Sequence, residues 1–437
     1  MQKQVQVKTW KADELPLDWF ERQKTDSKAA EQVEDSIKTI INQVKEDGDR
    51  ALVELTRKFD KAKLTRKTLR ATAEETKEAY RKTSREQVAA LKFMQQKVSS
   101  FQRQQLQQTE TQASSDGITV RTILKPIESV GCYVPGGRAA YPSTLIMTAV
   151  PAKVAGVPRI VVCSPPDAEG KVNPLVLVAS DVCGVDEVYK VGGAQAIAAL
   201  AYGTETVTPV KKIVGPGSRY VTAAKALVSK DVAIDMPAGP SEVVVLADET
   251  ADARLIAFDM VSQAEHGEDS VAGLITTSEK VASKVQDYLS KLAVSAERRE
   301  KISEALSKYG FIIVCNSLQE AQGLVNQFAP EHLEVMTAKP EKIANKLTAG
   351  LILAGPFSPV ALSDYGSGTN HVLPTGGFAQ VFSGLSALDF TRRVSIVESS
   401  KEGLEKVKET IKIMAEAENL PNHYRAIEAR FQNDESA

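Results

Sequence analysis

The residues best suited to chemistry lie just past the middle of the chain. A Pro- and Gly-rich bend over 237–240 is followed by Ser241 and Glu242 and then by apolar residues that predict a strand. Polar side chains on a rigid bend between buried segments usually face a ligand. Further on, Gln263 and His266 stand at positions i and i+3, which on a helix points both side chains to one face. This spacing suits two ligands of one metal ion.

The four histidines of the chain all have acidic or amide neighbours. His332 directly follows Glu331, so an imidazole and a carboxylate of different pKa stand together, as a multi-step proton transfer requires. A set of nitrogen and oxygen donors suits zinc or a similar divalent ion, and here that set is Gln263, His266, Asp364 and His423. Surface and capping histidines also have polar neighbours, and spacing does not show which segments meet in space. The metal site and the acid–base pair are therefore hypotheses.

The elements that must position these residues alternate between short apolar runs and helical patterns. The predicted strands are 118–124, 127–134, 159–163, 187–191, 212–214, 243–247, 274–276, 311–314, 333–336 and 351–354. Helical patterns separate many of them, for example 174–183, 194–202 and 219–229. This alternation is typical of βαβ units with parallel sheets, so we predict an α/β fold of two doubly wound, incomplete Rossmann-like domains.

The chain exceeds the size at which one core usually stops growing, and Gly-Pro-rich bends at 135–137 and 237–240 bracket its first alternating block. We therefore predict one domain inserted in the other. The predicted divisions are an N-terminal arm (1–27), a main domain (28–130 and 241–385), an inserted domain (131–240) and a helical C-terminal segment (386–437). The arm carries Trp10, Trp19 and Phe20, which need a surface on this chain or on a partner subunit.

Composition excludes several classes of protein. The 437 residues are 43% hydrophobic and 25% charged, as in ordinary globular proteins, and the net charge of −2 argues against a general affinity for nucleic acid or anionic membrane. The start has no apolar signal region, and no later run is long enough to span a membrane, so we expect a cytoplasmic protein. Four scattered cysteines suit a reducing compartment, and Cys132 is expected to be a buried small residue rather than a nucleophile.

Two strand-to-helix turns are rich in glycine. They read Val191-Gly-Gly-Ala-Gln and Val214-Gly-Pro-Gly-Ser. Glycine lets a backbone approach a phosphate, and the N-terminus of the following helix offers free N–H groups. Neither turn is a G-x-G-x-x-G fingerprint, so a dinucleotide role is one hypothesis and an ordinary tight turn is the other.

With these motifs the chain resembles the histidinol dehydrogenase family over nearly its whole length. The motifs are Gly131-Cys-Tyr-Val-Pro-Gly-Gly, Val191-Gly-Gly-Ala-Gln, Val214-Gly-Pro-Gly, Ile234-Asp-Met-Pro-Ala-Gly-Pro-Ser-Glu, Ser262-Gln-Ala-Glu-His-Gly, Ala329-Pro-Glu-His-Leu and Gly368-Thr-Asn-His-Val-Leu-Pro-Thr. The resemblance implies a homodimer with one zinc per subunit that oxidises L-histidinol through the aldehyde to L-histidine, with two NAD in succession.

The resemblance also implies residue roles. The metal ligands fall on Gln263, His266, Asp364 and His423, the last from the other subunit, and the acid–base pair falls on Glu331 and His332. Together with His332 and the metal ligands, Ser241, His371 and Glu418 match positions that hold the substrate. Tyr133, Gln195 and Ser218 match positions that contact NAD, with Ser218 in place of the family's asparagine.

Three other readings stay open at this stage. One is a paralogous zinc- and NAD-dependent dehydrogenase of another small polyol, such as a sulfonated propanediol. The others are a zinc hydrolase that uses Glu331 to activate water, against which the glycine-rich turns count, and a metal-binding scaffold without activity, against which the intact Glu331-His332 pair counts.

Overall fold

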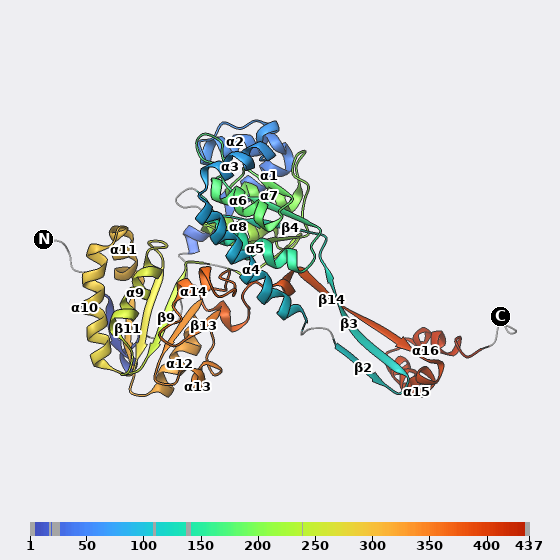
Figure 1. Ribbon diagram of the computed structural model, residues 1–437. Helices are drawn as coiled ribbons and strands as arrows, with labels where there is room; N and C mark the ends of the chain where they lie inside the picture. Colours follow the sequence, from blue (N-terminus) through green and yellow to red (C-terminus); the bar gives the residue numbers. More distant parts are fainter. Residues whose placement is uncertain are drawn as a thin grey trace.

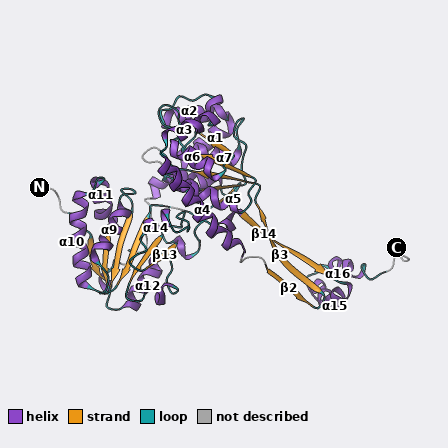
Figure 2. Ribbon diagram, in the orientation of Figure 1, coloured by secondary structure: helices purple, strands orange, loops and turns teal. Residues whose placement is uncertain are grey.

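The computed structural model describes residues 5–16, 19, 27–107, 111–136, 141–237 and 239–432. Three sheets organise the chain, two of them parallel and one antiparallel (Figure 1). Helices cover the parallel sheets, and the antiparallel sheet extends away from both (Figure 2). The predicted α/β class with two parallel sheets is confirmed.

The larger parallel sheet contains the two neighbouring strands, β9 and β12, that begin next to the predicted catalytic residues. Its strands, in spatial order, are β1 (Lys8–Lys11), β11 (Phe311–Val314), β10 (Val271–Thr276), β9 (Glu242–Ala247), β12 (His332–Met336) and β13 (Leu351–Ala354). One face packs on α9 (Ala253–Ala264), α10 (Glu279–Ser295), α11 (Arg299–Tyr309) and α14 (Val360–Tyr365). The other face packs on α12 (Leu318–Phe328) and α13 (Pro340–Ala344). Residues of β9 alternate between the two cores, as a strand covered on both faces requires.

The second parallel sheet has five strands. They are, in spatial order, β6 (Glu187–Tyr189), β5 (Arg159–Cys163), β4 (Ser129–Tyr133), β7 (Lys212–Val214) and β8 (Ala233–Ile234). One face packs on α1 (Ser27–Asp47), α2 (Asp49–Phe59), α7 (Gly193–Tyr202) and α8 (Arg219–Val228). The other packs on α3 (Ala73–Lys82), α4 (Arg85–Gln107), α5 (Pro142–Val154) and α6 (Pro174–Cys183).

The helical region that begins near residue 28 belongs to the five-stranded sheet, not to the main domain where the sequence analysis placed it. Ile37 and Leu52 share one core with the five-stranded sheet, and Leu91 shares the other. A helical pattern shows that one face is buried but does not show which sheet covers it, which explains the wrong boundary. Because β1 lies in the six-stranded sheet, the five-stranded unit is nevertheless inserted in the other, from an earlier starting point.

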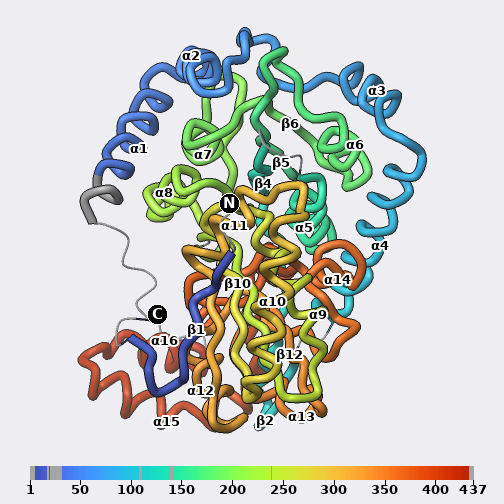
Figure 3. Tube along the Cα trace, turned by 90° about the vertical axis from the view of Figure 1, so that its left-hand side faces the viewer, coloured from blue at the N-terminus to red at the C-terminus, as the bar shows by residue number. Residues whose placement is uncertain are grey.

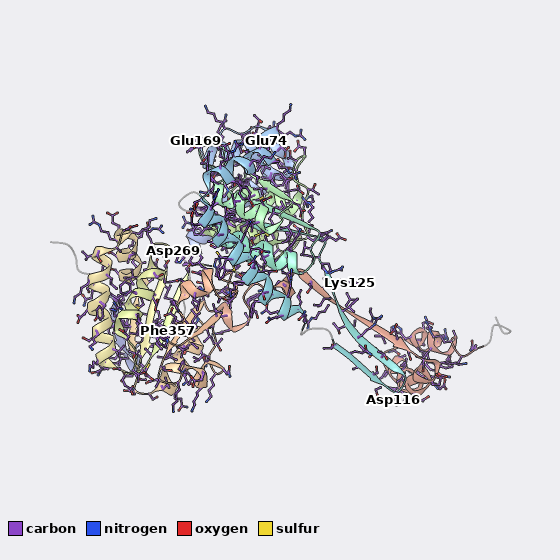
Figure 4. The ribbon with its side chains drawn as sticks, viewed as in Figure 1. Glu74, Asp116, Lys125, Glu169, Asp269 and Phe357 are labelled. Atoms are coloured by element: carbon purple, nitrogen blue, oxygen red, sulfur yellow. The ribbon has the colours of Figure 1, made fainter. Side chains whose placement is uncertain are left out.

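The antiparallel sheet forms an arm. It consists of β14 (Thr391–Ser399), β3 (Ile118–Pro126) and β2 (Thr111–Ser115), and it carries α15 (Lys401–Ala417) and α16 (Pro421–Glu428) near its end (Figure 1). In Figure 4, Lys125 marks where the arm leaves the body, and Asp116 marks the tip. The Lys406 ammonium group lies 3.0 Å from the Asp116 carboxylate and ties α15 to this tip. The prediction of a helical C-terminal segment is confirmed for α15 and α16, whereas residues 391–399, also assigned to that segment, form the strand β14.

Short 3₁₀ helices complete the described elements. They are η1 (Ala12–Glu14), η2 (Arg66–Thr68), η3 (Phe378–Gln380) and η4 (Ala387–Phe390).

The N-terminal aromatic residues pack on their own chain. Strand β1 runs along the edge of the larger sheet (Figure 3), and Trp10 joins the core on the α12 side. The Trp19 ring centroid lies 5.1 Å from that of Phe311 and 5.3 Å from that of Phe328. The third aromatic residue of the predicted arm, Phe20, and most of residues 17–26 lie outside the described residues.

The four cysteines are free and buried. Burial raises the pKa of the Cys132 thiol to about 12, which confirms the expectation of an inert small residue. Among the helices that the structure describes, none has both the length and the apolar composition to cross a bilayer.

Candidate active site

The predicted catalytic residues meet at the amino-terminal edge of the larger sheet. Ser241 precedes β9, Glu331 precedes β12, and Val243 pairs in register with His332. The Val271 N–H donates to the Ser241 carbonyl (2.9 Å), so β10 begins at the same edge as β9. Helix α9 leads into β10, and its last turn, which carries Gln263, therefore lies at this edge. Ligands of open α/β sheets usually bind at the opposite, carboxyl edge. The C-terminus of α9 carries a partial negative charge, which favours cations here.

The hydrogen bonds around His332 identify its free nitrogen. Nδ1 lies 3.2 Å from the Glu242 carbonyl oxygen and 3.6 Å from Glu331 Oε2, whereas Nε2 is buried and has no hydrogen-bond partner among the described residues. A carbonyl oxygen only accepts, so we assign the proton to Nδ1 and the lone pair to Nε2. Burial lowers the pKa of His332, but the Glu331 carboxylate and the Glu242 carbonyl outweigh it, so the net pKa is raised. His332 thus has the tautomer of a general base.

The carboxylate of Glu331 is held by the neighbouring strand. The Glu242 backbone N–H donates to Glu331 Oε2 at 2.7 Å, and the Glu331 backbone N–H donates to Glu242 Oε2 at 3.3 Å. Glu331 is only 7% exposed. The carboxylate and the imidazole therefore lie side by side in a fixed, largely dry setting, which suits a pair of proton-transfer groups.

Two further histidines gather around Asp364 at the C-terminal end of α14. His371 Nδ1 lies 3.3 Å from Asp364 Oδ1. Burial raises the pKa of the Asp364 carboxyl, but the hydrogen bond and charge of His371, with the charges of His332 and His266, bring it below its ordinary value. The segments of Asp364 and His371 are therefore in contact, and His332 and His266 are near enough to act on Asp364 through their charges.

Three of the four proposed metal ligands come from elements that end at this edge. Gln263 is buried in α9, and His266 follows the cap of that helix, which ends two residues earlier than the predicted Gln-to-His helix. With Asp364 they offer nitrogen and oxygen donors and no thiolate, which fits zinc with a coordination position still open. Within the described ranges no group of three His, Cys, Asp or Glu side chains is placed to hold a metal ion. The proposed set contains only two such residues, His266 and Asp364, because its third member, Gln263, is an amide.

The remaining two predicted residues lie elsewhere in the same chain. Glu418 caps α15 and His423 is in α16, both exposed, at the far end of the arm from the six-stranded sheet (Figure 1). One chain therefore does not bring them to the edge that carries His332.

The predicted NAD contacts lie at the carboxyl edge of the five-stranded sheet. Tyr133 ends β4, and its hydroxyl accepts the Gly193 N–H at 3.0 Å, at the start of α7. Gln195 is buried in the first turn of α7, and a Cβ at Gly193 would lie 2.8 Å from its Oε1. Ser218 is the N-cap of α8, makes no capping hydrogen bond and is exposed. The N-termini of α7 and α8 at this edge favour anions.

A buried ion pair holds the second glycine turn. The Lys225 ammonium group contacts Asp235 and donates to the Gly215 carbonyl at 2.9 Å, while the Gly215 N–H donates to Asp235 Oδ2 at 2.7 Å. Gly215 has φ +115°, and a Cβ there would lie 2.2 Å from the Tyr133 carbonyl oxygen, so only glycine fits. The pair fixes the turn that presents Ser218.

The two edges are in contact. The Asn370 side chain donates to the Met147 carbonyl of α5 at 2.7 Å. Burial, followed by the charges of Asp364 and Glu265, raises the pKa of Tyr365, and Tyr141 adds a smaller contribution. Tyr365 follows Asp364, and Tyr141 precedes α5 in the segment after β4. The carboxyl edge of the five-stranded sheet, which favours anions, therefore lies next to the amino edge of the six-stranded sheet. The latter favours cations and carries the buried base His332.

Sequence reasoning did not assign several residues that support this arrangement. They are Asp259, Glu334, Lys225 and Asp235, and also Glu242, which the sequence singled out on the bend after residue 240 but to which it gave no role. The available signal was a charged residue inside or at the head of an otherwise apolar buried segment, because such a residue needs a partner.

Two adjoining parallel α/β units, one with glycine turns at helix N-termini and one with a buried acid–base pair, define an enzyme of the dinucleotide-dependent dehydrogenase class. The family model for histidinol dehydrogenase matches residues 22–431. A histidinol dehydrogenase of Methanothermobacter thermautotrophicus is 45% identical over 395 residues, covering 90% of this chain and 92% of that protein. One of Clostridium acetobutylicum is also 45% identical, over 91% of this chain and 92% of that protein.

A crystal structure of histidinol dehydrogenase from Elizabethkingia anophelis superposes with a TM-score of 0.91 at 36% identity, covering 97% of this chain and 98% of that one. The chain belongs to the histidinol dehydrogenase family of NAD-dependent oxidoreductases.

Proposed function

We propose that this chain oxidises L-histidinol through L-histidinaldehyde to L-histidine, with two NAD reduced in succession. The observation that carries the proposal is the buried His332, whose Nδ1 is held by the Glu242 carbonyl and whose Nε2 is left without a partner beside Glu331 and Asp364. Membership of the family supports the choice of substrate.

In the first oxidation His332 removes the hydroxyl proton. Its Nε2 accepts that proton while the carbinol carbon gives up a hydride, so the C–O bond becomes a carbonyl. NAD supplies the hydride acceptor when bound. The Glu331 carboxylate stabilises the imidazolium that results, because it lies 3.6 Å from Nδ1.

In the second oxidation Glu331 activates water. The carboxylate accepts one proton from a water molecule as the water oxygen attacks the aldehyde carbon. A hydride then leaves that carbon for the second NAD, and the carboxylic acid so formed loses its remaining proton. One water is consumed and the product is the carboxylate of histidine. Burial of Glu331 and His332 keeps other water away from the aldehyde.

A zinc ion would be held by Gln263, His266 and Asp364, with His423 of a second subunit as the fourth ligand in this proposal. The ion would bind the imidazole and amine of the substrate and so fix the reacting carbon, and positioning of this kind lowers a barrier by several kcal/mol. Ser241, His371 and Glu418 would hold the substrate with His332. The Asp364–His371 contact of 3.3 Å supports this arrangement, because it holds a proposed metal ligand beside a proposed substrate-binding residue.

The arm supports a homodimer with a shared active site. Its apolar side chains Val397, Ile413 and Met414 are exposed, although apolar area of this kind is normally covered. Because Glu418 and His423 lie on the same arm, an exchange of arms would deliver both residues to the other subunit. We propose this exchange as the means by which the site is completed.

The NAD side would use Tyr133, Gln195 and Ser218. The Ser218 hydroxyl is shorter than the family's asparagine amide and would contact NAD directly or through one water. A cytoplasmic location is also part of the proposal, because four buried free thiols suit a reducing compartment.

The division of labour is tested by supplying each substrate separately. The unmodified protein should reduce NAD with histidinol and with histidinaldehyde, whereas Glu331→Gln should still oxidise the alcohol but lose aldehyde oxidation by a factor of about 10² or more. Equal loss of both half-reactions would show that Glu331 does not act on the water step.

A further inference from the structure

Glu242 contacts both predicted catalytic residues and the segment that follows His371. Its backbone N–H donates to Glu331 Oε2 (2.7 Å), and its carbonyl oxygen lies 3.2 Å from His332 Nδ1. Its side chain accepts the Glu331 backbone N–H at Oε2 (3.3 Å) and the Gly376 backbone N–H at Oε1 (3.0 Å). The residue is only 4% exposed.

These contacts are reciprocal. The main chain of Glu242 orients the Glu331 carboxylate and the His332 imidazole, and its side chain fixes the main chain from which Glu331 projects. A shift of this strand end would therefore move both catalytic groups at once. The hydrogen bond from the Gly376 N–H to Oε1 links the same side chain to segment 371–376, since the two oxygens of a carboxyl group can accept from two backbone donors.

A purely structural role would give a different result, and the chain contains a matched example. Asp248 follows the other end of β9, where its Oδ2 accepts the Ala338 N–H (2.8 Å) just beyond the other end of β12. Its Oδ1 accepts the Thr250 N–H (3.0 Å). Asp248 thus links the same two strands, β9 and β12, through the same kind of carboxylate–backbone hydrogen bond, at the edge away from His332.

We propose that Glu242 is a positioning residue that sets the orientation of the acid–base pair and the place of segment 371–376. The inference rests on the proposed roles of Glu331 and His332. Glu242 itself exchanges no proton with the substrate and acts only through the groups that it holds.

The test compares Glu242→Gln with Asp248→Asn. In each variant one acceptor oxygen becomes an amide that faces a backbone N–H, so both should lower the thermal midpoint, and Glu242→Gln should lower it more because its site is buried whereas Asp248 is half-buried. We expect Glu242→Gln to lower kcat by about 30-fold or more, since a misplacement of about 1 Å can cost about 10²-fold, with the KM for NAD changed less than about threefold. Asp248→Asn should keep kcat within about twofold.

A conservative variant, Glu242→Asp, separates a loss of activity from a failure to fold. Glu242→Asp keeps the charge but shortens the side chain, so it cannot reach both the Glu331 and Gly376 N–H groups, and an intermediate loss of kcat is expected. The inference is overturned if Glu242→Gln and Asp248→Asn change kcat equally, or if Glu242→Asp is fully active.

Failure of the proposed function is seen separately, as an unmodified protein that forms no NADH from histidinol. The inference is then judged by imidazole ¹⁵N chemical shifts, which are practical because the chain has four histidines, with His332→Gln to assign the signal. Glu242→Gln should change the tautomer balance of His332 and Asp248→Asn should not. Equal spectra for both variants would overturn the inference.

Discussion

A pair of buried carboxyl groups behind the active site should make the larger α/β unit less stable as the pH rises. Glu334 in β12 is 1% exposed, and its Oε1 accepts the Val360 N–H at 2.9 Å. Among the described residues its Oε2 has no donor as long as both Glu334 and its neighbour Asp259 are ionised. Asp259 in α9 is hydrogen-bonded to Glu334 through its side chain. Two carboxyl groups can form such a contact only when they share a proton.

The direction of the effect follows from the pKa values. Burial raises the pKa of Asp259 from 3.8 to about 6. Burial and the charge of Asp259 raise the pKa of Glu334 well above 4.5. The folded state therefore binds protons more tightly than the unfolded state, so this contribution is fully present below pH 4 and is lost as pH rises through 6 and beyond.

The magnitude is set by the shift of Asp259. About two pKa units correspond to about 3 kcal/mol, and partial exposure of this side chain reduces that figure to about 1–3 kcal/mol. For a unit of this size each kcal/mol corresponds to roughly 2–4 °C in the melting temperature. The consequence reaches the active site, because α9 carries Gln263 and α14 begins at Val360.

The perturbation is Asp259→Asn, whose amide can donate to Glu334 Oε2 without a shared proton. Melting temperatures of both proteins between pH 4 and 8 should show the unmodified protein losing stability relative to the variant by the amount above. Asp287→Asn, at an exposed site on α10, should follow the unmodified protein. Parallel curves for Asp259→Asn and the unmodified protein would refute the shared proton.

Three further predictions concern the catalytic and metal groups. His332→Gln should lower turnover by orders of magnitude, and Glu331→Gln should do the same for the aldehyde step. In both variants the zinc content measured by atomic absorption should stay near normal. Loss of zinc would mean that the roles of the two residues are misassigned. His266→Asn should lower zinc occupancy, and unchanged occupancy would remove His266 from the ligand set. A mixed dimer of a Glu331→Gln chain with a His423→Asn chain should recover activity, because one of its two sites has both residues intact; absence of recovery in a dimer shown to be mixed would place the whole site in one chain.

The main elements of both parallel sheets could be predicted from the sequence. Helix α6 has the predicted bounds, and β5, β7, β11 and β13 match as strands, because continuous apolar runs between turn residues are typical of parallel strands covered on both faces. The strand β1 could not be recognised, since it is short and polar and is defined by its partner β11. The arm strand β14 is exposed along most of its length, so burial gives no alternating signal.

The candidate site was predictable in residue type but not in place. The neighbours Glu331 and His332, and the spaced Gln263 and His266, were evident because chemistry and spacing coincide. The contact of His371 with Asp364 and the hydrogen bonds of Glu242 to Glu331 depend on which strand ends meet. Only the order of strands in the sheet determines this.

The most direct test of the central claim is the number of NADH molecules formed for each L-histidinol consumed, with zinc present and after chelation. The account predicts two NADH per substrate, loss of this activity on chelation, and recovery when zinc is restored. No NADH from histidinol, in protein shown to hold zinc, would contradict it.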